Sequence, residues 1–383
     1  MKKKALMVCS NYWNSPFHVG SHHIACSLVK MGWDVAFISA PVSLLHLIGK
    51  TDLRQRFNLY RGGGKTFLDS HLWAYVPGAL IVPHKFPLLR SKWVLNHWWR
   101  LTIPNVVKEV QLHDFGCVNL LYMDSFIQPC WIDTICFEKS VLRISDHSAS
   151  LGSPSTAVME SQDRLAKQVD LVVYSATTLE PYVASFRPRR TMYFPNGVDV
   201  SHFEEAVTDK PVEYENVRKP IAIYIGAMDY WFDFDLVEYA ARRLPDISFV
   251  FLGPEDRAEG RLKDLPNLHF LGRKNYSEIP AYLHHADVGL IPFNRRKYPT
   301  LIDHIHPLKL YEYLASGLPV VAVDWAELRA LKSPAVLCRT ADEFVNGIAK
   351  AISDTGSSLE RIRYANTADW DNRVLSLVKS LDL

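Results

Sequence analysis

The sequence lacks the features that mark several classes of protein. Its six cysteines are scattered and form no CxxC pair, which indicates free thiols in a cytosolic protein. No run of 18 apolar residues occurs, so no transmembrane helix is predicted. The start, MKKKALMVCS, carries an apolar run of only about six residues and no small-residue cleavage site follows it, so no signal peptide is predicted.

Motifs for common cofactors are missing as well. No GxGxxG follows the first predicted strand, which disfavours a nicotinamide-dependent enzyme. The segment RGGGKT at 61–66 resembles a phosphate loop, but Leu59 stands where such a loop needs glycine, so a flexible loop is predicted. His304 and His306 lie near Asp303, yet no third or fourth ligand cluster accompanies them. We therefore predict no metal and no bound cofactor.

The net charge is small. In total, 43 Lys+Arg and 41 Asp+Glu leave +2, which argues against a strongly basic nucleic-acid binder. The total hides an asymmetry, because residues 1–112 hold 14 Lys+Arg and 4 Asp+Glu, a balance of +10. Residues 113–383 hold 29 and 37, a balance of −8. One end of the chain is therefore basic, and this asymmetry indicates a partner.

What the chain does contain is a regular alternation of apolar runs and amphipathic segments. Strands are predicted at 4–10, 34–39, 117–122, 140–145, 170–175, 191–194, 220–226, 248–253, 268–271, 287–292, 319–324 and 335–338. Helices are predicted at 20–31, 156–168, 177–186, 234–243, 277–285, 307–316, 341–353 and 357–382. This alternation predicts an α/β fold with parallel sheets covered on both faces.

The alternation is interrupted at 201–218, which is polar and predicted to be a linker. We expect two Rossmann-like, doubly wound domains at 1–200 and 201–355, and a helix at 356–383 that crosses back to the first. Ligands in such sheets bind at the carboxyl ends of the strands. Two domains that face each other across a deep cleft favour an enzyme that joins two substrates.

A basic and aromatic segment occupies residues 84–108, without any acidic residue. Indole rings and cationic side chains of this kind suit an anionic membrane surface, because the rings lie at headgroup level and the cations attract phosphates. The alternative is a core helix with a solvated basic face. The candidate membrane residues are Lys85, Arg90, Lys92, Trp93, Trp98, Trp99 and Arg100.

The most specific pattern is HPLKLYEYLASGLPVVAVD at 306–324. A helix that opens after Pro307 presents backbone N–H groups to an anion, and Lys309 in its first turn can reach the same anion. The carboxylate of Glu312, one helical turn after Lys309, can accept hydrogen bonds from two ribose hydroxyl groups. The alternative is a generic helix start with a Lys–Glu pair.

The segments FPNGVDVSHF at 194–203, FLGRKNYSEIPAYLHHADVGLIPF at 270–293 and PLKLYEYLASGLPVVA resemble the nucleotide-sugar-binding half of GT-B glycosyltransferases. Over nearly the whole chain, the sequence is similar to bacterial exopolysaccharide and teichuronic-acid glycosyltransferases, including the xanthan glucuronosyltransferase type. The resemblance of SVLRISDHSAS at 140–150 implies that Asp146 is the general base. It also implies that 84–108 faces the membrane.

The resemblance implies a role in donor binding for six residues of the second half. Lys309 would neutralise the diphosphate of the donor, Met228 would lie over the nucleotide, and Glu312 would hold the ribose. Arg273 would line the base or ribose pocket. Either Phe293 or Asn294 would lie near the donor, because the motif can be aligned with this segment in two ways that differ by one residue.

One position departs from the large retaining families, whose motif has a second glutamate eight residues before Glu312. His304 stands there, which favours inversion of the anomeric centre. In the loop after the first strand, the candidate acceptor-binding residues are Trp13, His18, His22 and His23, with a structural role as the alternative. The basic run from Arg295 to Lys297 either binds a negatively charged group of the donor sugar or is a solvated loop.

The expected function is an inverting, metal-independent transfer from a UDP-sugar to a lipid-linked saccharide at the inner face of the cytoplasmic membrane. The UDP-sugar could be UDP-glucuronic acid. The alternative within the same fold is a retaining transferase that uses GDP-mannose or UDP-glucose. A sugar-nucleotide epimerase leaves the basic aromatic segment unexplained. The last alternative is a two-lobed sugar-binding protein. Such proteins are normally exported, and the lack of a predicted signal peptide argues against this alternative.

Overall fold

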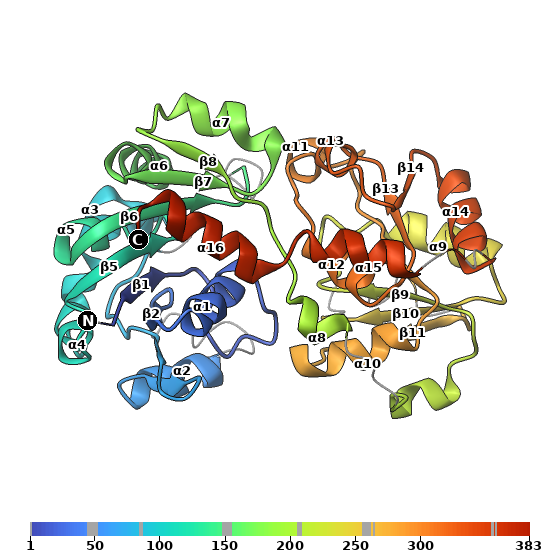
Figure 1. Ribbon diagram of the computed structural model, residues 1–383, viewed down its shortest axis with the longest axis horizontal. Helices are drawn as coiled ribbons and strands as arrows, with labels where there is room; N and C mark the ends of the chain where they lie inside the picture. Colours follow the sequence, from blue (N-terminus) through green and yellow to red (C-terminus); the bar gives the residue numbers. More distant parts are fainter. Residues whose placement is uncertain are drawn as a thin grey trace. The chain divides into compact units, whose positions relative to one another are not determined.

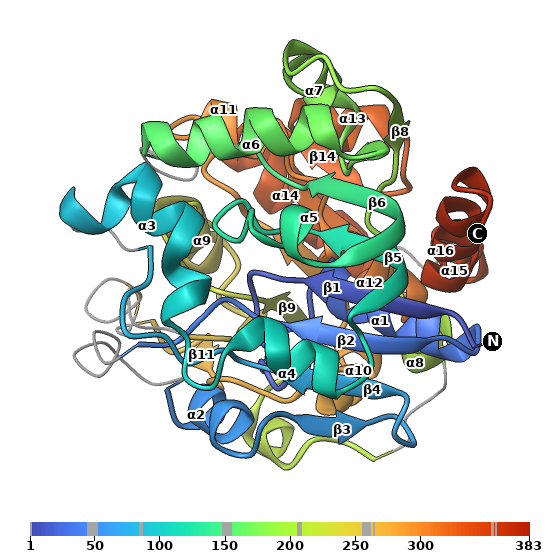
Figure 2. The ribbon, with the colours of Figure 1, turned by 90° about the vertical axis from the view of Figure 1, so that its left-hand side faces the viewer.

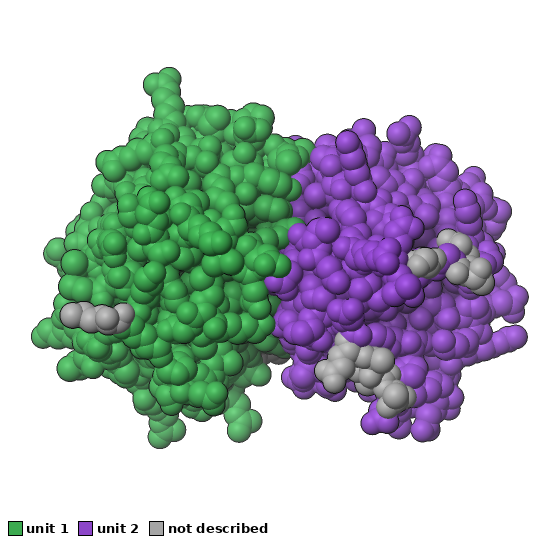
Figure 3. Space-filling view, in the orientation of Figure 1, with its two compact units in different colours: residues 1–195, 371–383 green, residues 196–370 purple. Residues whose placement is uncertain are grey.

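The computed structural model describes residues 2–43, 53–83, 87–147, 155–204, 209–254, 262, 265–353, 356 and 358–383. The chain forms two compact units, shown in Figure 3. Unit 1 comprises 1–195 with 371–383, and unit 2 comprises 196–370. The division thus falls five residues before the boundary predicted at 200, and the C-terminal segment is shared between the units.

Unit 1 is built on an eight-stranded sheet of order β3-β4-β2-β1-β5-β6-β7-β8, parallel except for the β3–β4 pair. Its strands are β1 (Lys4–Val8), β2 (Asp34–Ile38), β3 (Lys65–Phe67), β4 (Leu72–Tyr75), β5 (Cys117–Met123), β6 (Cys136–Ile144), β7 (Leu171–Tyr174) and β8 (Thr191–Tyr193). Its α-helices are α1 (Gly20–Lys30), α2 (Leu53–Arg61), α3 (Lys92–His97), α4 (Val106–Leu112), α5 (Trp131–Thr134), α6 (Thr156–Gln168), α7 (Glu180–Ser185) and α16 (Trp370–Ser380). Short 3-10 turns are η2 (Pro87–Arg90), η3 (Trp98–Leu101) and η5 (Thr177–Leu179).

Unit 2 has a six-stranded parallel sheet of order β11-β10-β9-β12-β13-β14. Its strands are β9 (Ile221–Ile225), β10 (Ser248–Leu252), β11 (Leu268–Phe270), β12 (Val288–Ile291), β13 (Val320–Val323) and β14 (Val336–Cys338). Its α-helices are α8 (Val200–Glu204), α9 (Phe234–Arg243), α10 (Ile279–His284), α11 (Pro299–Ile302), α12 (Leu308–Ala315), α13 (Ala326–Ala330), α14 (Ala341–Ser353) and α15 (Ser358–Asn366), with 3-10 turns η6 (Val212–Asn216) and η7 (Tyr276–Glu278).

The predicted α/β class and every predicted strand are confirmed. The strands form because their apolar runs are continuous, as in β1, where Ala5 to Val8 are all fully buried. Such runs need cover on both faces of a parallel sheet. In unit 1, α4, α5 and α6 pack on one face; Figure 2 views this side of the unit. In unit 2, α9 and α14 cover one face, and α12 with α15 covers the other (Figure 1).

Three local predictions are corrected. The segment 61–66 is not a flexible loop, because Gly64 N–H donates to Leu59 O and Gly63 N–H to Tyr60 O, both at 3.1 Å. This pair of bonds ends α2 in a Schellman turn that leads into β3, and both glycines have positive φ. Neither α2 nor the β3–β4 pair was predicted, since these strands are too short to show a period.

The predicted linker at 201–218 is part of unit 2. Phe203 and Tyr214, in α8 and η6, are fully buried in the unit 2 core. The last predicted helix, 357–382, is two helices. The backbone between them pairs with Val198, which donates to Ala368 O and accepts from Trp370 N–H. In α16, Asp371 accepts hydrogen bonds from Ser27 and Lys30 of unit 1.

The register of β5 and β6 brings together two cysteines that lie apart in the sequence. Cys117 and Cys136 are directly opposite each other, both are exposed, and a hydrogen bond between the thiols raises the pKa of Cys117. Adjacent positions on paired strands lie within the Cα separation that a disulfide spans.

We therefore expect oxidised glutathione to convert this dithiol into an intramolecular disulfide by two steps of thiol–disulfide exchange, with release of reduced glutathione. Intact-mass measurement should show the loss of two hydrogens, and peptide mapping should locate the Cys117–Cys136 bond. The Cys117→Ser variant is the control. Mixed disulfides at both positions, without the internal bond, would contradict the register.

Candidate active site

The clearest site in unit 2 lies where β9 ends. Gly226 follows this strand with φ of +137°, and its N–H donates to Leu252 O at 2.8 Å. A Cβ built on Gly253 would lie 2.0 Å from Gly226 O, so glycine is required for the two loops to approach. A Cβ on Gly226 would lie 3.5 Å from Nζ of Lys309. The ammonium group of Lys309 is therefore held against the backbone at the carboxyl edge of the sheet.

Lys309 lies in the first turn of α12, among aromatic rings. Its Nζ is 4.8 Å from the ring centre of Phe293 and 5.2 Å from that of Tyr224. Burial lowers the pKa of Lys309 to about 8, against the opposing charge of Glu312. Burial raises the pKa of Glu312 to about 7, against the charge of Lys309. Tyr224, Gly226, Phe293, Lys309 and Glu312 are called the Lys309 site below.

The other predicted donor residues are placed differently. Phe293 borders Lys309, and Asn294 is the next residue along the chain. The Asn294 side chain accepts from Lys297 N–H at 3.1 Å and shapes the turn. Met228 is buried in the core beyond β9. Arg273 is exposed beyond β11, the edge strand, which β10 separates from β9.

The histidine-rich turn before α12 has structural partners. His306 is buried, its backbone O accepts from Asn196 at 2.7 Å, and its Nε2 lies 3.2 Å from the Tyr311 hydroxyl. Asp303 binds Arg295 through two hydrogen bonds of 2.7 and 3.1 Å. Within the described part of the chain, no group of three or more His, Cys, Asp or Glu side chains could hold a metal ion.

In unit 1, a cluster of one buried and two half-buried charged residues lies at the carboxyl ends of β5 and β6. Arg143, near the end of β6, is 3% exposed, and Asp124 and Asp146 follow the two strands. Burial raises the pKa of both carboxyl groups, and the charge of Arg143 opposes this rise. Asp124 accepts from Ser10 N–H at 3.0 Å. These three residues are called the Arg143 cluster.

Gly20, the first residue of α1, leaves the space that Arg143 fills. A Cβ there would lie 2.1 Å from a terminal guanidinium nitrogen of Arg143. Neither Arg143 nor Asp124 was singled out from the sequence. An arginine inside the apolar run SVLRIS was the available signal, because a charge in a buried strand needs an ionic partner.

Three of the predicted acceptor-binding residues are buried in unit 1, and for His22 the contacts favour the structural alternative. Trp13, His22 and His23 are 8%, 0% and 6% exposed. In His22, Nδ1 accepts from Val19 N–H at 3.2 Å, so Nε2 donates to Tyr12 O at 3.0 Å. Burial also lowers the pKa of His22, which keeps it neutral. Of the four, His18 alone is partly exposed, and its ring stacks on His22.

The comparisons with known proteins cover both units. Residues 7–175 match the model of the N-terminal domain of glucuronosyltransferase GumK, and 219–354 match glycosyl transferases group 1. The curated relative is the putative teichuronic acid biosynthesis glycosyltransferase TuaH of Bacillus subtilis (strain 168). It is 28% identical over 159 residues, which is 39% of this chain and 39% of the relative.

Solved structures match over the full length of the chain. Sucrose-phosphate synthase of Thermosynechococcus elongatus superposes with a TM-score of 0.69 at 14% identity, covering 99% of this chain and 98% of that one. HepE of Anabaena, in complex with UDP and glucose, superposes with a TM-score of 0.65 at 14% identity, covering 99% of both chains. At this identity, the likeness shows the fold.

The chain has the GT-B fold.

In this GT-B-type chain, the basic aromatic segment is only partly a surface. Trp98 is fully buried, and its Nε1 donates to Ile127 O at 3.1 Å, so its predicted membrane role is wrong. Trp99 is partly buried beneath the guanidinium of Arg100, at 5.1 Å. Trp93 is 57% exposed, and Lys92 beside it pairs with Glu160. Arg90 and Arg100 are exposed, and Lys85 lies outside the described residues.

Two further apolar side chains are exposed, one within this segment and one shortly before it. Leu80 and Ile103 are 61% and 57% exposed and flank the bridge between Ala79 and Thr102. We call Leu80, Arg90, Trp93, Arg100 and Ile103 the Trp93 surface. No helix among the described residues has the length and apolar character needed to cross a membrane.

Substitution of Trp98 and of Trp93 should change the free energy of unfolding by very different amounts. Trp98→Ala should lower the free energy of unfolding by about 3–5 kcal/mol, because it empties a large core position. Trp93→Ala should change it by less than about 0.5 kcal/mol, because the ring is exposed. Urea denaturation followed by circular dichroism measures both. Equal effects of the two substitutions would contradict the burial described here.

Proposed function

We propose that this protein transfers a sugar from a UDP-sugar to a lipid-linked saccharide acceptor at an anionic membrane surface, with inversion and without a metal. The observation that carries the proposal is the Lys309 site, where a half-buried cation and the start of α12 meet at the carboxyl edge of the unit 2 sheet. The name of TuaH, which refers to teichuronic acid biosynthesis, supports a polysaccharide product.

The Lys309 site suits a nucleoside diphosphate as leaving group. When the bond between the anomeric carbon and the phosphate oxygen breaks, negative charge develops on the diphosphate. Lys309 and the N–H groups of the first turn of α12 stabilise that charge in a poorly hydrated setting. Glu312, one turn along α12, is placed to accept ribose hydroxyls. The complex of HepE with UDP and glucose supports UDP as the nucleotide.

Asp146 suits the role of general base. The acceptor hydroxyl oxygen attacks the anomeric carbon as its proton passes to the Asp146 carboxylate. Burial raises the pKa of Asp146, which makes the carboxylate a stronger base than an exposed aspartate. The charge of Arg143 opposes that rise and so favours the ionised form of the base.

Inversion and metal independence rest on particular residues. His304 replaces the second glutamate of the retaining motif. Lys309 supplies the charge that a divalent cation provides in other transferases. The match of unit 1 to the glucuronosyltransferase GumK model supports a uronic acid as the transferred sugar.

The acceptor side of the proposal rests on the basic character of residues 1–112 and on the Trp93 surface. An exposed indole, exposed aliphatic side chains and exposed arginines are the kinds of group that bind the headgroup region of an anionic bilayer. A lipid-linked acceptor would be presented at that surface.

The base assignment predicts that Asp146→Asn loses transfer but keeps nucleotide binding. Since the amide cannot accept the proton, kcat should fall by about 10²–10⁴-fold. The UDP dissociation constant, measured by calorimetry, should stay unchanged. Asp163→Asn, at an exposed ion pair on α6, is the matched control. Unaltered turnover of Asp146→Asn would remove the assignment. The anomeric configuration of the product, determined by NMR, separates inversion from retention.

The Lys309 pKa of about 8 predicts a pH dependence of UDP binding. The cation is present below this pH and is lost as pH rises through it. The UDP dissociation constant should therefore increase by up to about tenfold per pH unit above the pKa. In Lys309→Arg the charge persists, so the profile should stay flat to about pH 10. Parallel profiles for the two proteins would contradict a role of Lys309 at the diphosphate.

The Trp93 surface predicts binding to anionic vesicles. Co-sedimentation with phosphatidylglycerol vesicles should fall severalfold in Trp93→Ser combined with Arg100→Gln, and phosphatidylcholine vesicles should bind little protein. Arg189→Gln, at another exposed arginine of unit 1, is the control. Equal sedimentation of all three proteins would exclude this surface.

A further inference from the structure

Unit 2 contains a cavity of about 1030 Å³ that the proposed transfer does not use. It lies at the carboxyl ends of β13 and β14, between the loop after β12 and the starts of α9 and α14. Phe293 borders both this cavity and the Lys309 site, but Lys309 itself does not line the cavity. The volume is at the upper end of the range typical for small-molecule sites.

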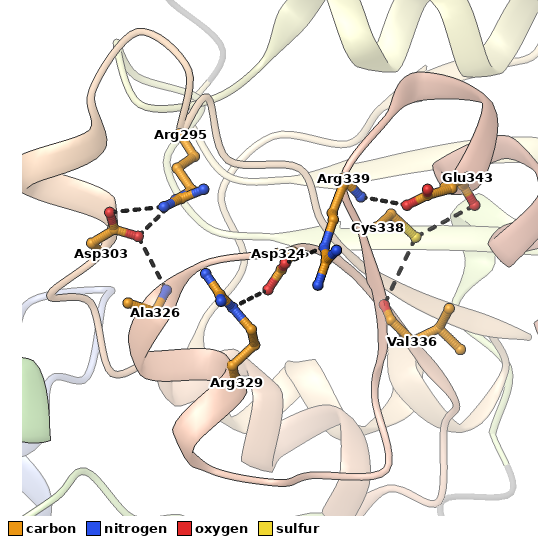
Figure 4. Close-up of polar contacts among 9 residues, drawn as sticks. All are labelled: Arg295, Asp303, Asp324, Ala326, Arg329, Val336, Cys338, Arg339 and Glu343. Atoms are coloured by element: carbon orange, nitrogen blue, oxygen red, sulfur yellow. Dashed lines mark hydrogen bonds and ion pairs between the residues drawn. The ribbon is translucent and has the colours of Figure 1, made fainter.

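Four arginines line the cavity, contributed by three separate segments: Arg295, Arg296, Arg329 and Arg339. Arg329 and Arg339 are oriented by one buried carboxylate, that of Asp324, whose side chain is 5% exposed. Nε of Arg329 lies 2.8 Å from one oxygen, and Nε of Arg339 lies 3.0 Å from the other. Figure 4 shows the two guanidinium groups on either side of this carboxylate.

This arrangement leaves hydrogen-bond donors for a ligand. Each guanidinium contacts Asp324 through Nε, on one edge, and carries its two terminal amino groups on the other edge. The side chains of Arg329 and Arg339 are 49% and 74% exposed, so these edges are accessible. One carboxylate shared by two guanidinium groups also leaves one net positive charge.

Arg295 is fixed in the same way by a second carboxylate. Asp303 accepts two hydrogen bonds from its guanidinium and a third, of 3.1 Å, from Ala326 N–H at the start of α13 (Figure 4). Arginines held by buried or partly buried acids lose little conformational freedom on binding an anion.

The charge balance sets the number of anionic groups that fit. Four arginines and three aspartates, Asp233, Asp235 and Asp324, line the cavity, and Asp303 behind the wall pairs with Arg295. The excess positive charge is therefore local to the two guanidinium groups that share Asp324. The positive dipole ends of α9 and α14 add to this charge. The rest of the wall includes apolar groups such as Leu236, Phe293 and Val323. A ligand with one anionic group on a larger, weakly polar body suits this wall better than a polyanion.

We propose that this cavity binds an acidic saccharide, a sugar-sized molecule that carries a carboxylate or a monophosphate, at a site separate from the Lys309 site. The anionic group binds between Arg329 and Arg339, and the sugar ring packs against the apolar wall near Phe293. The proposal is independent of the transfer reaction, since its arginines are absent from both the Lys309 site and the Arg143 cluster.

The test is calorimetric titration of the whole protein with D-glucuronate, glucose 6-phosphate, glucose and inorganic phosphate. At least one acidic sugar should bind, whereas glucose should not, and the comparison of the two acidic sugars identifies the preferred anion. Binding of inorganic phosphate as tight as that of both acidic sugars would mean an adventitious ion only and would overturn the proposal. Saturating UDP should leave the binding in place, and displacement by UDP would show that the cavity is part of the donor site.

Two variants assign the binding to the arginines. Arg339→Gln should weaken it by about tenfold, since a charge-assisted contact is lost. This side chain is largely exposed, so the variant should fold, which circular dichroism checks. Arg242→Gln, at an exposed Glu238 pair on α9 outside the cavity, is the control and should bind normally. Asp324→Asn keeps every arginine but removes their shared partner, and it should also weaken binding. Unchanged affinity in Arg339→Gln and Asp324→Asn would overturn the proposal.

Discussion

The Lys309 site of unit 2 depends on one backbone contact, the approach of Gly253 to the carbonyl of Gly226. A Cβ at Gly253 would lie 2.0 Å from that carbonyl oxygen, so any other residue would separate the two loops. The contact, together with the Gly226 N–H bond to Leu252 O, fixes the backbone at the end of β9. The Lys309 ammonium rests against this backbone, and α12 follows from there. The position of the cation is thus a consequence of chain geometry rather than of a single ion pair.

Both units place charged groups where water is largely excluded, and they do so at the same edge of their sheets. In unit 1 the cation is Arg143, which stays charged when buried, beside two carboxyl groups with raised pKa. In unit 2 the cation is Lys309, whose pKa falls on burial. The two residues differ in chemistry, because a guanidinium group keeps its charge when it is buried, whereas an ammonium group loses its proton more readily. Desolvation of charged side chains costs free energy, and both units place such groups at the carboxyl ends of the parallel strands, where ligands bind in this type of sheet.

Much of the fold could be predicted because the strands are continuous apolar runs and the helices carry a clear period. The site was partly predictable for a similar reason: Pro307, Lys309 and Glu312 lie within one helix, so their spacing determines their relative placement. Residues that meet across strands were not predictable in this way. Cys117 and Cys136 are neighbours only because of the β5–β6 register, and Arg329 and Arg339 meet at Asp324 because β13 and β14 end side by side.

By itself, the sequence determined the class of fold, twelve of the strands, the longer helices of the two sheets and the helix that carries Lys309, since periodicity and local motifs are short-range properties of the chain. Only the tertiary structure decided which side chains are accessible. Trp93 and Trp98 share one short basic segment, yet the first is exposed and the second is in the core. His22 has both ring nitrogens bound to backbone, a role set by the path of the loop around it. Burial depends on which elements pack against a residue, and that packing is decided by parts of the chain far away in sequence.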